Sequence, residues 1–234
     1  MLIDLHSHTS GISHCCRAAA PRILEEAKNV GLDGIVLTNH YHFGYIKNMT
    51  PYEFAEKYVN EYFYTKALGD EMSFKVFFGI ELTLEKHEGA HALIYGVDTD
   101  FALKYPDMYN LTLKELYPLV HAHGGAIVHA HPYRHGKDVL DTNYLDGVEV
   151  NCHGNYDATH SERLYEIAKA NSIMLTCGGD YHADNYRPMC GTYLPEEIQN
   201  ESDIAKFILT AKKVKLRVHE LREPTYFEKE YTVR

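Results

Sequence analysis

Histidines and carboxylates recur along this chain beside short apolar runs, and this pattern limits the possible folds more than any other feature. Six segments carry it: residues 3–8, 35–40, 77–81, 91–96, 127–132 and 177–182. Short apolar runs bounded by polar residues are typical of buried strands. Because the carboxyl ends of parallel strands meet at one face of a sheet or barrel, we expect these polar side chains to gather in one place.

Strand and helix patterns alternate along the chain. We expect strands at 2–6, 34–38, 74–84, 91–97, 126–130, 146–151 and 173–177, with a further one at 214–218. The expected helices are 22–30, opened by Pro21 and closed by Gly31, then 51–68, 112–123, 159–171, and one capped by Asp203 that runs to about 213. This alternation predicts parallel βα units, and roughly seven strands predict a closed α/β barrel. Residues 42–72 resemble an insertion near the site, and the tail from Pro224 has no clear assignment.

Composition narrows the class of protein. The chain has 234 residues, which fits one α/β barrel, so we expect a single domain over 1–234. Its formal charge of −10 argues against extended nucleic acid as a partner. Neither a signal peptide nor a membrane span is evident, and five cysteines, an odd count, indicate no disulfide framework. We therefore expect a cytoplasmic protein; its oligomeric state is left open.

Histidine, with 16 copies, is the anomaly in the composition, and its placement indicates a metal site. His6 and His8 are two residues apart, so on a strand both side chains lie on one face. Glu81 ends an apolar strand with no arginine nearby in sequence, and an unpaired buried carboxylate is costly. Asp180 and His182 repeat the two-residue spacing. Imidazole and carboxylate ligands suit zinc, iron or manganese, and the candidates exceed what one ion needs.

Several of these residues also have simpler interpretations. The simpler interpretation of His91 is a polar residue that begins a strand, and that of Asp180 is a turn residue after Gly178 and Gly179. His131 precedes Pro132, which predicts an extended conformation at that histidine. His129 is interpreted as a residue of the core or one that supports a ligand.

Taken in order, these motifs resemble the PHP (polymerase and histidinol phosphatase) family. The matching motifs are His6-Ser7-His8, Thr38-Asn39-His40, Gly79-Ile80-Glu81, His91 before Ala-Leu-Ile-Tyr-Gly, Ala130-His131-Pro132 and Gly179-Asp180-Tyr181-His182. The resemblance covers residues 3 to about 191. It implies a distorted seven-stranded (β/α)7 TIM-like barrel, up to three ions of zinc, iron or manganese, and phosphoester hydrolysis.

The resemblance also implies a ligand set for each ion. One site would use His6, His8, Glu81 and Asp180. A second would share bridging Glu81 and add His91 and His131, and the third would use His14, His40 and His182. Two positions depart from the family: Asn39 stands where aspartate is usual, and His14 stands where relatives often have aspartate. We interpret Asn39 as a hydrogen-bonding residue behind the ligands.

The expected reaction is attack on phosphorus by a metal-activated hydroxide, with a small phosphorylated substrate. No nucleophile elbow or cysteine phosphatase loop is present. Arg134 and Arg187 lie in loops of the expected active-site face and are candidates for binding a phosphate. His153 is a candidate general acid, although a loop hydrogen bond explains it equally well.

Two alternatives remain. One is a metal-dependent amidohydrolase or deaminase, which also begins with His-x-His but usually has a longer barrel and a lysine that bridges two metals. The other is a non-catalytic metal-binding PHP module, in which ligands should have been lost.

Overall fold

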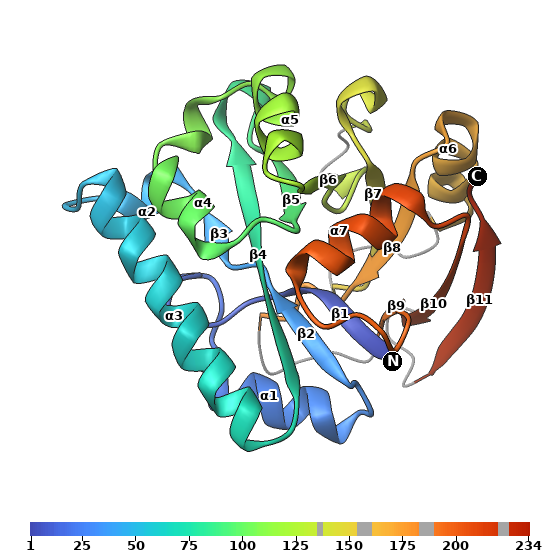
Figure 1. Ribbon diagram of the computed structural model, residues 1–234, viewed down its shortest axis with the longest axis horizontal. Helices are drawn as coiled ribbons and strands as arrows, with labels where there is room; N and C mark the ends of the chain where they lie inside the picture. The colour runs from blue at the N-terminus through green and yellow to red at the C-terminus, as the bar shows by residue number, and fades with distance from the viewer. Residues whose placement is uncertain (135–137, 154–160, 183–189, 220–224) are drawn as a thin grey trace.

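The computed structural model describes residues 1–134, 138–153, 161–182, 190–219 and 225–234. Its strands are β1 (Leu2–Ser7), β2 (Gly34–Leu37), β3 (His40–Tyr41), β4 (Lys75–Leu84), β5 (Ala90–Tyr95), β6 (Ala126–His129), β7 (Gly147–Asn151), β8 (Met174–Gly178), β9 (Gly191–Tyr193), β10 (Lys213–His219) and β11 (Tyr226–Thr232). Its helices are α1 (Ala20–Asn29), α2 (Phe43–Ile46), α3 (Pro51–Glu71), α4 (Thr99–Lys104), α5 (Leu113–Ala122), α6 (Ser161–Asn171) and α7 (Glu201–Thr210). Figure 1 shows these elements in chain order.

The strands form one mixed sheet that curls into a nearly closed barrel. Its order is β11-β10-β9-β1-β2-β4-β5-β6-β7-β8, with β3 paired to β4. Strand β8 returns to lie beside β1, and among the described residues one isolated bridge, between Ser7 and Tyr181, joins the two sides. In addition, the Asp180 N–H donates to the His6 carbonyl at 2.8 Å. We call this junction the β1–β8 seam.

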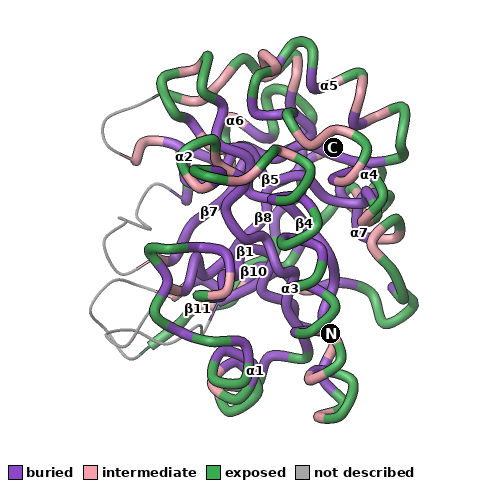
Figure 2. The backbone as a smooth tube through the Cα atoms, turned by 90° about the vertical axis from the view of Figure 1, so that its left-hand side faces the viewer, coloured by how far each residue is buried: buried purple, intermediate pink, exposed green. Residues whose placement is uncertain are grey.

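The helices lie outside this sheet (Figure 1), and the strands at the centre are almost entirely buried (Figure 2). The sequence determines where the helices begin. Thr50 and Glu53 form a capping box for α3, and Thr112 and Glu115 form one for α5. None of the helices in the described part of the chain is both long and apolar enough to cross a membrane.

The sheet has eleven strands, so the expected count of seven was too low. The short β9 and the tail strand β11 were not predicted, and both pair antiparallel beside β1 and β10. Helix α7 begins after Asn200, whose side chain accepts from the Asp203 N–H, so Asp203 is not the cap.

Strands β4 and β5 are antiparallel, not members of two parallel βα units. The connection from Leu84 to Ala90 is too short to hold a crossover helix, so the chain must reverse. This reversal has a consequence for the site. His91 lies at the start of β5, yet it pairs with Thr83 near the end of β4 and so reaches the same face of the barrel as Glu81.

Candidate metal centre

Glu81 is the centre of the site. Its side chain is fully buried, and five imidazoles surround it. Its Oε1 lies 2.7 Å from His91 Nδ1, 3.0 Å from His131 Nε2 and 3.4 Å from His6 Nε2. Its Oε2 lies 2.5 Å from His40 Nδ1 and 3.3 Å from His8 Nε2. Burial alone would raise the pKa of Glu81, but the histidines around it, His40 first, hold that pKa well below its usual value.

Asp180 faces the same group from the other side of the β1–β8 seam. Its Oδ1 lies 3.1 Å from His8 Nε2 and 3.5 Å from His6 Nε2. In the structure, Nε2 of His6 and Nε2 of His8 are buried and make no hydrogen bond within the described part of the chain. Two buried imidazole nitrogens directed at two carboxylates are the arrangement that a shared cation would stabilise.

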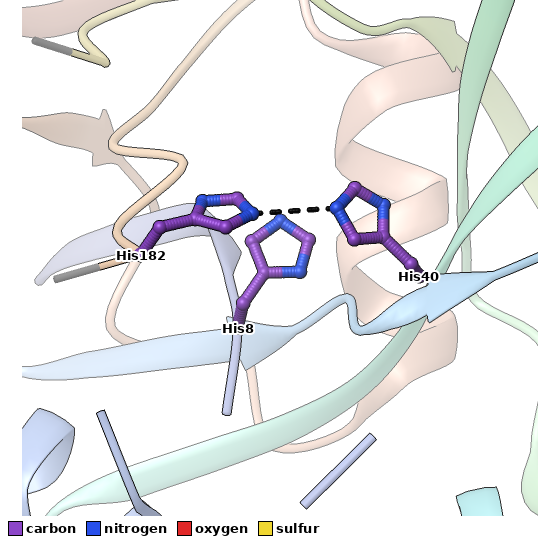
Figure 3. A group of neighbouring side chains, drawn as sticks. All are labelled: His8, His40 and His182. Atoms are coloured by element: carbon purple, nitrogen blue, oxygen red, sulfur yellow. Dashed lines mark hydrogen bonds between the residues drawn. The ribbon is translucent and has the colours of Figure 1, made fainter. Parts of the chain in front are cut away.

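Two of these histidines, His8 and His40, also form a second group with His182. His8, His40 and His182 come from different segments and converge, as Figure 3 shows. Nε2 of His40 and Nε2 of His182 are 3.3 Å apart, and the His8 ring lies 4.4 and 4.3 Å from the rings of His40 and His182. Although burial alone would lower the pKa of His40, Glu81 and Cys15 raise it to about 9.

These separations match the spacing of ligands around one ion. With metal–nitrogen bonds of about 2.0–2.1 Å, tetrahedral geometry places neighbouring ligand atoms roughly 3.3 Å apart. The distances from His6 to Glu81, from His8 to Asp180 and from His40 to His182 lie between 3.1 and 3.4 Å. The residues present therefore fit divalent ions.

A further set of polar residues orients these side chains. Nδ1 of His6 is 2.8 Å from Glu149, which also accepts from the His131 N–H at 2.9 Å. Asn39 accepts from Ser13, whose hydroxyl lies 3.1 Å from His8 Nδ1, so Asn39 is linked to His8 through Ser13. Carboxylates and hydroxyls in this position fix the tautomer of a ligating histidine.

Sequence analysis missed two buried carboxylates, although the signal was available. Glu149 interrupts the apolar run of β7, and Asp4 interrupts that of β1. Asp4 accepts from the N–H groups of His6 and Gly179 and from the Ser7 hydroxyl, so it ties β1 to the end of β8. Burial raises its pKa to about 7.

His131 departs from the expected extended conformation. Its φ is +35°, and Asp180 also has a positive φ, of +50°. Left-handed backbone is uncommon for residues other than glycine and concentrates at functional sites. In both cases the unusual backbone accompanies a side chain that reaches the central group. His129, by contrast, is buried and accepts from the Leu140 N–H, which is the supporting role expected of it.

The structure does not bring His14 to the histidine group. His14 is exposed, and its ring packs on Tyr45 at 4.3 Å. The next residue, Cys15, is also exposed, but its thiol interacts with both His40 and His182 and lies 3.6 Å from the Tyr45 hydroxyl. Burial would raise the pKa of Cys15, but the two imidazoles lower it to about 5, which gives the sulfur thiolate character.

A cavity of about 380 Å³ opens over this group. Arg134 lines it and donates to Asp180 Oδ2 at 3.0 Å, so its guanidinium lies at the site as expected. His153 also lines the cavity, but burial lowers its pKa to about 4, so its ring is neutral at pH 7. Arg187 lies outside the described residues.

Comparison with known proteins adds a likeness of fold. No family model matches the chain, and no curated protein matches it. Solved structures do match. A candidate metal-dependent phosphoesterase from Bifidobacterium adolescentis is 17% identical, with a TM-score of 0.56 over 88% of this chain and 95% of that one. PsfC from Pseudomonas syringae is 17% identical, with a TM-score of 0.58 over 99% of this chain and 91% of its own.

A third match is an amidohydrolase from Chromobacterium violaceum, solved with bound sulfate and no metal. It is 14% identical, with a TM-score of 0.54 over 88% of this chain and 96% of that one. At such identities the likeness concerns the fold alone. The chain therefore has a fold that is found among metal-dependent hydrolases.

Proposed function

We propose that this chain is a metal-dependent hydrolase of small phosphoesters, built as one PHP-type domain over residues 1–234. The observation that carries the proposal is the buried Glu81 carboxylate within 3.4 Å of five imidazoles. A structural role does not require so many titratable groups around one buried carboxylate, whereas several divalent ions would use them all.

The resemblance to the PHP family suggests how these residues divide among the ions. His6, His8, Glu81 and Asp180 would hold one ion, and Glu81, His91 and His131 a second. His40 and His182 would hold a third, with Cys15 in the place expected for His14. The ions, which we expect to be zinc, iron or manganese, would supply a water of lowered pKa and neutralise charge on the phosphoryl oxygens.

The chain's own residues would bind and orient the substrate. Arg134 lies in the cavity wall with one nitrogen on Asp180, which leaves other guanidinium N–H groups to pair with phosphoryl oxygens. Arg187 is a second candidate for that role. His153 is neutral at pH 7, so we assign it to positioning a substrate oxygen and not to protonating the leaving group.

The main competitor is a metal-dependent amidohydrolase. Lysine does not occur among the described residues that line the cavity, and the central carboxylate, which we propose as the bridge, is Glu81. Both facts favour a phosphoesterase over an amidohydrolase. The experiment is metal analysis of the purified protein, followed by assays on p-nitrophenyl phosphate, a phosphodiester, an amide and a nucleobase. Chelator-sensitive hydrolysis of phosphoesters is expected, and turnover of the amide or the base alone would reverse the assignment.

A further inference from the structure

Three cysteines meet at a second place in the molecule. Cys152 directly follows β7, Cys177 lies in β8, and Cys190 directly precedes β9. Their sulfur atoms all lie within 4.8 Å of one another, and those of Cys152 and Cys177 are 3.6 Å apart. All three residues are buried and all are free thiols. We call this group the thiol cluster.

The thiol cluster is separate from the metal centre around Glu81. On β7, Glu149 points into the barrel toward His6, and its partner on β8 is Thr176. Because side chains alternate along a strand, Cys177 points to the opposite face of the sheet. There its thiol lies 3.3 Å from the carbonyl oxygen of Arg217 in β10. The cluster thus lies between the barrel wall and the β9–β10 strands.

The spacing of the sulfur atoms suits a thiophilic ion. With zinc–sulfur bonds of about 2.3 Å, a tetrahedral site has neighbouring sulfur atoms roughly 3.8 Å apart. A disulfide would need about 2.05 Å between two of them. The observed 3.6 Å is therefore close to the spacing around a common metal. Thiolate ligands select zinc over hard cations such as magnesium or calcium.

The surroundings can also stabilise the charge that a metal requires. Burial would raise the pKa of Cys152, but hydrogen bonds from Cys177, Cys190 and the backbone N–H of His219 hold it well below its usual value. Burial raises the pKa of Cys177 and that of Cys190 well above the usual value, so a bound metal would have to displace these two protons.

We propose that Cys152, Cys177 and Cys190 form a structural metal site that binds one Zn²⁺ ion through three thiolates. Binding releases the remaining thiol protons to solvent. The ion joins β7 and β8 of the barrel wall to the segment that enters β9, and it takes no part in the reaction at Glu81.

The experiment uses the full chain, reduced and loaded with zinc, carrying Cys15→Ser so that the one thiol at the catalytic centre is absent. Zinc X-ray absorption should show a sulfur shell at about 2.3 Å. This measurement leaves the thiol cluster itself unchanged, so it does not depend on whether a cluster variant folds. Scattering from nitrogen and oxygen alone would overturn the proposal, as would a disulfide within the cluster found by mass spectrometry.

A second measurement assigns the sulfur to these residues. Cobalt should give a thiolate charge-transfer band that persists in Cys15→Ser. The band should be lost when Cys190→Ser is added, while the ions at the Glu81 centre are retained. If the band disappears with Cys15→Ser alone, the thiol cluster binds no metal and the sulfur ligand belongs to the catalytic centre. Because neither readout measures activity, failure here leaves the proposed hydrolase untouched.

Discussion

The substitution Glu81→Gln isolates the charge of the central carboxylate while preserving its shape. Both oxygens of Glu81 face imidazoles, and the side chain has no exposed surface. The amide of glutamine would have to direct its NH₂ at imidazole nitrogens that ligate an ion, and it carries no charge to offset that ion. We therefore expect the two ions that share this residue to be lost together.

The size of the loss in metal affinity follows from the burial of Glu81. Removing one partner of a buried charge pair costs about 3–5 kcal/mol. Since 1.4 kcal/mol corresponds to a factor of ten, metal affinity should fall by roughly two to four orders of magnitude. Protein passed through a desalting column should then retain at most one ion per chain, with phosphoesterase activity reduced to background.

The assay is elemental analysis of wild type and variant prepared in parallel, with circular dichroism to verify folding. Glu85→Gln is the matched control, since Glu85 is exposed and pairs only loosely with His42 at 3.3 Å. That control should keep all its metal. If folded Glu81→Gln protein retains the wild-type number of ions, Glu81 does not bridge them and the assignment of the centre is refuted.

Three further predictions concern the edge of the site. Arg134→Ala should raise KM for a phosphomonoester about tenfold and leave the metal content unchanged. Arg22→Ala, on the surface of α1, is the control. An unchanged KM in Arg134→Ala would show that Arg134 does not bind the substrate. Cys15→Ser should lower the content of the ion assigned to His40 and His182, whereas His14→Ala should not, and the opposite result would restore His14 as the ligand. His153→Asn should leave the acidic limb of the plot of kcat against pH unshifted between about pH 5 and 8, because the pKa of His153 is about 4. A shift of that limb would identify His153 as the general acid.

Strand geometry explains which site residues could be predicted from sequence. His6, His8, Glu81, His131 and Asp180 follow or end apolar runs, so the ends of the strands bring them together. Eight of the nine predicted ligand-type residues lie in the central group. His91 lies in the central group for a different reason: the antiparallel turn after β4 places the start of β5 at that face.

The predictions that failed mostly concern segments without a periodic pattern of apolar residues. His14 and Cys15 occupy the loop between β1 and α1, where the sequence does not reveal which of two adjacent side chains lies nearer to His40 and His182. Strand β9 has three residues and β11 alternates weakly, so neither produced a readable pattern. Glu149 and Asp4 are different, since each is a carboxylate within an apolar run and was visible in the sequence.

The β1–β8 seam affects how readily the protein opens and is degraded. Two proposed ligands, His6 and His8, lie on one side of this weakly hydrogen-bonded junction, and Asp180 and His182 lie on the other. An ion held by both sides would therefore bind the closed barrel and not the open one, which shifts the local opening equilibrium. Amide hydrogen exchange at Asp180, whose N–H bonds to His6, should accelerate when metal is withdrawn. A cell short of metal would then hold a form of this protein that opens more often and is more readily degraded.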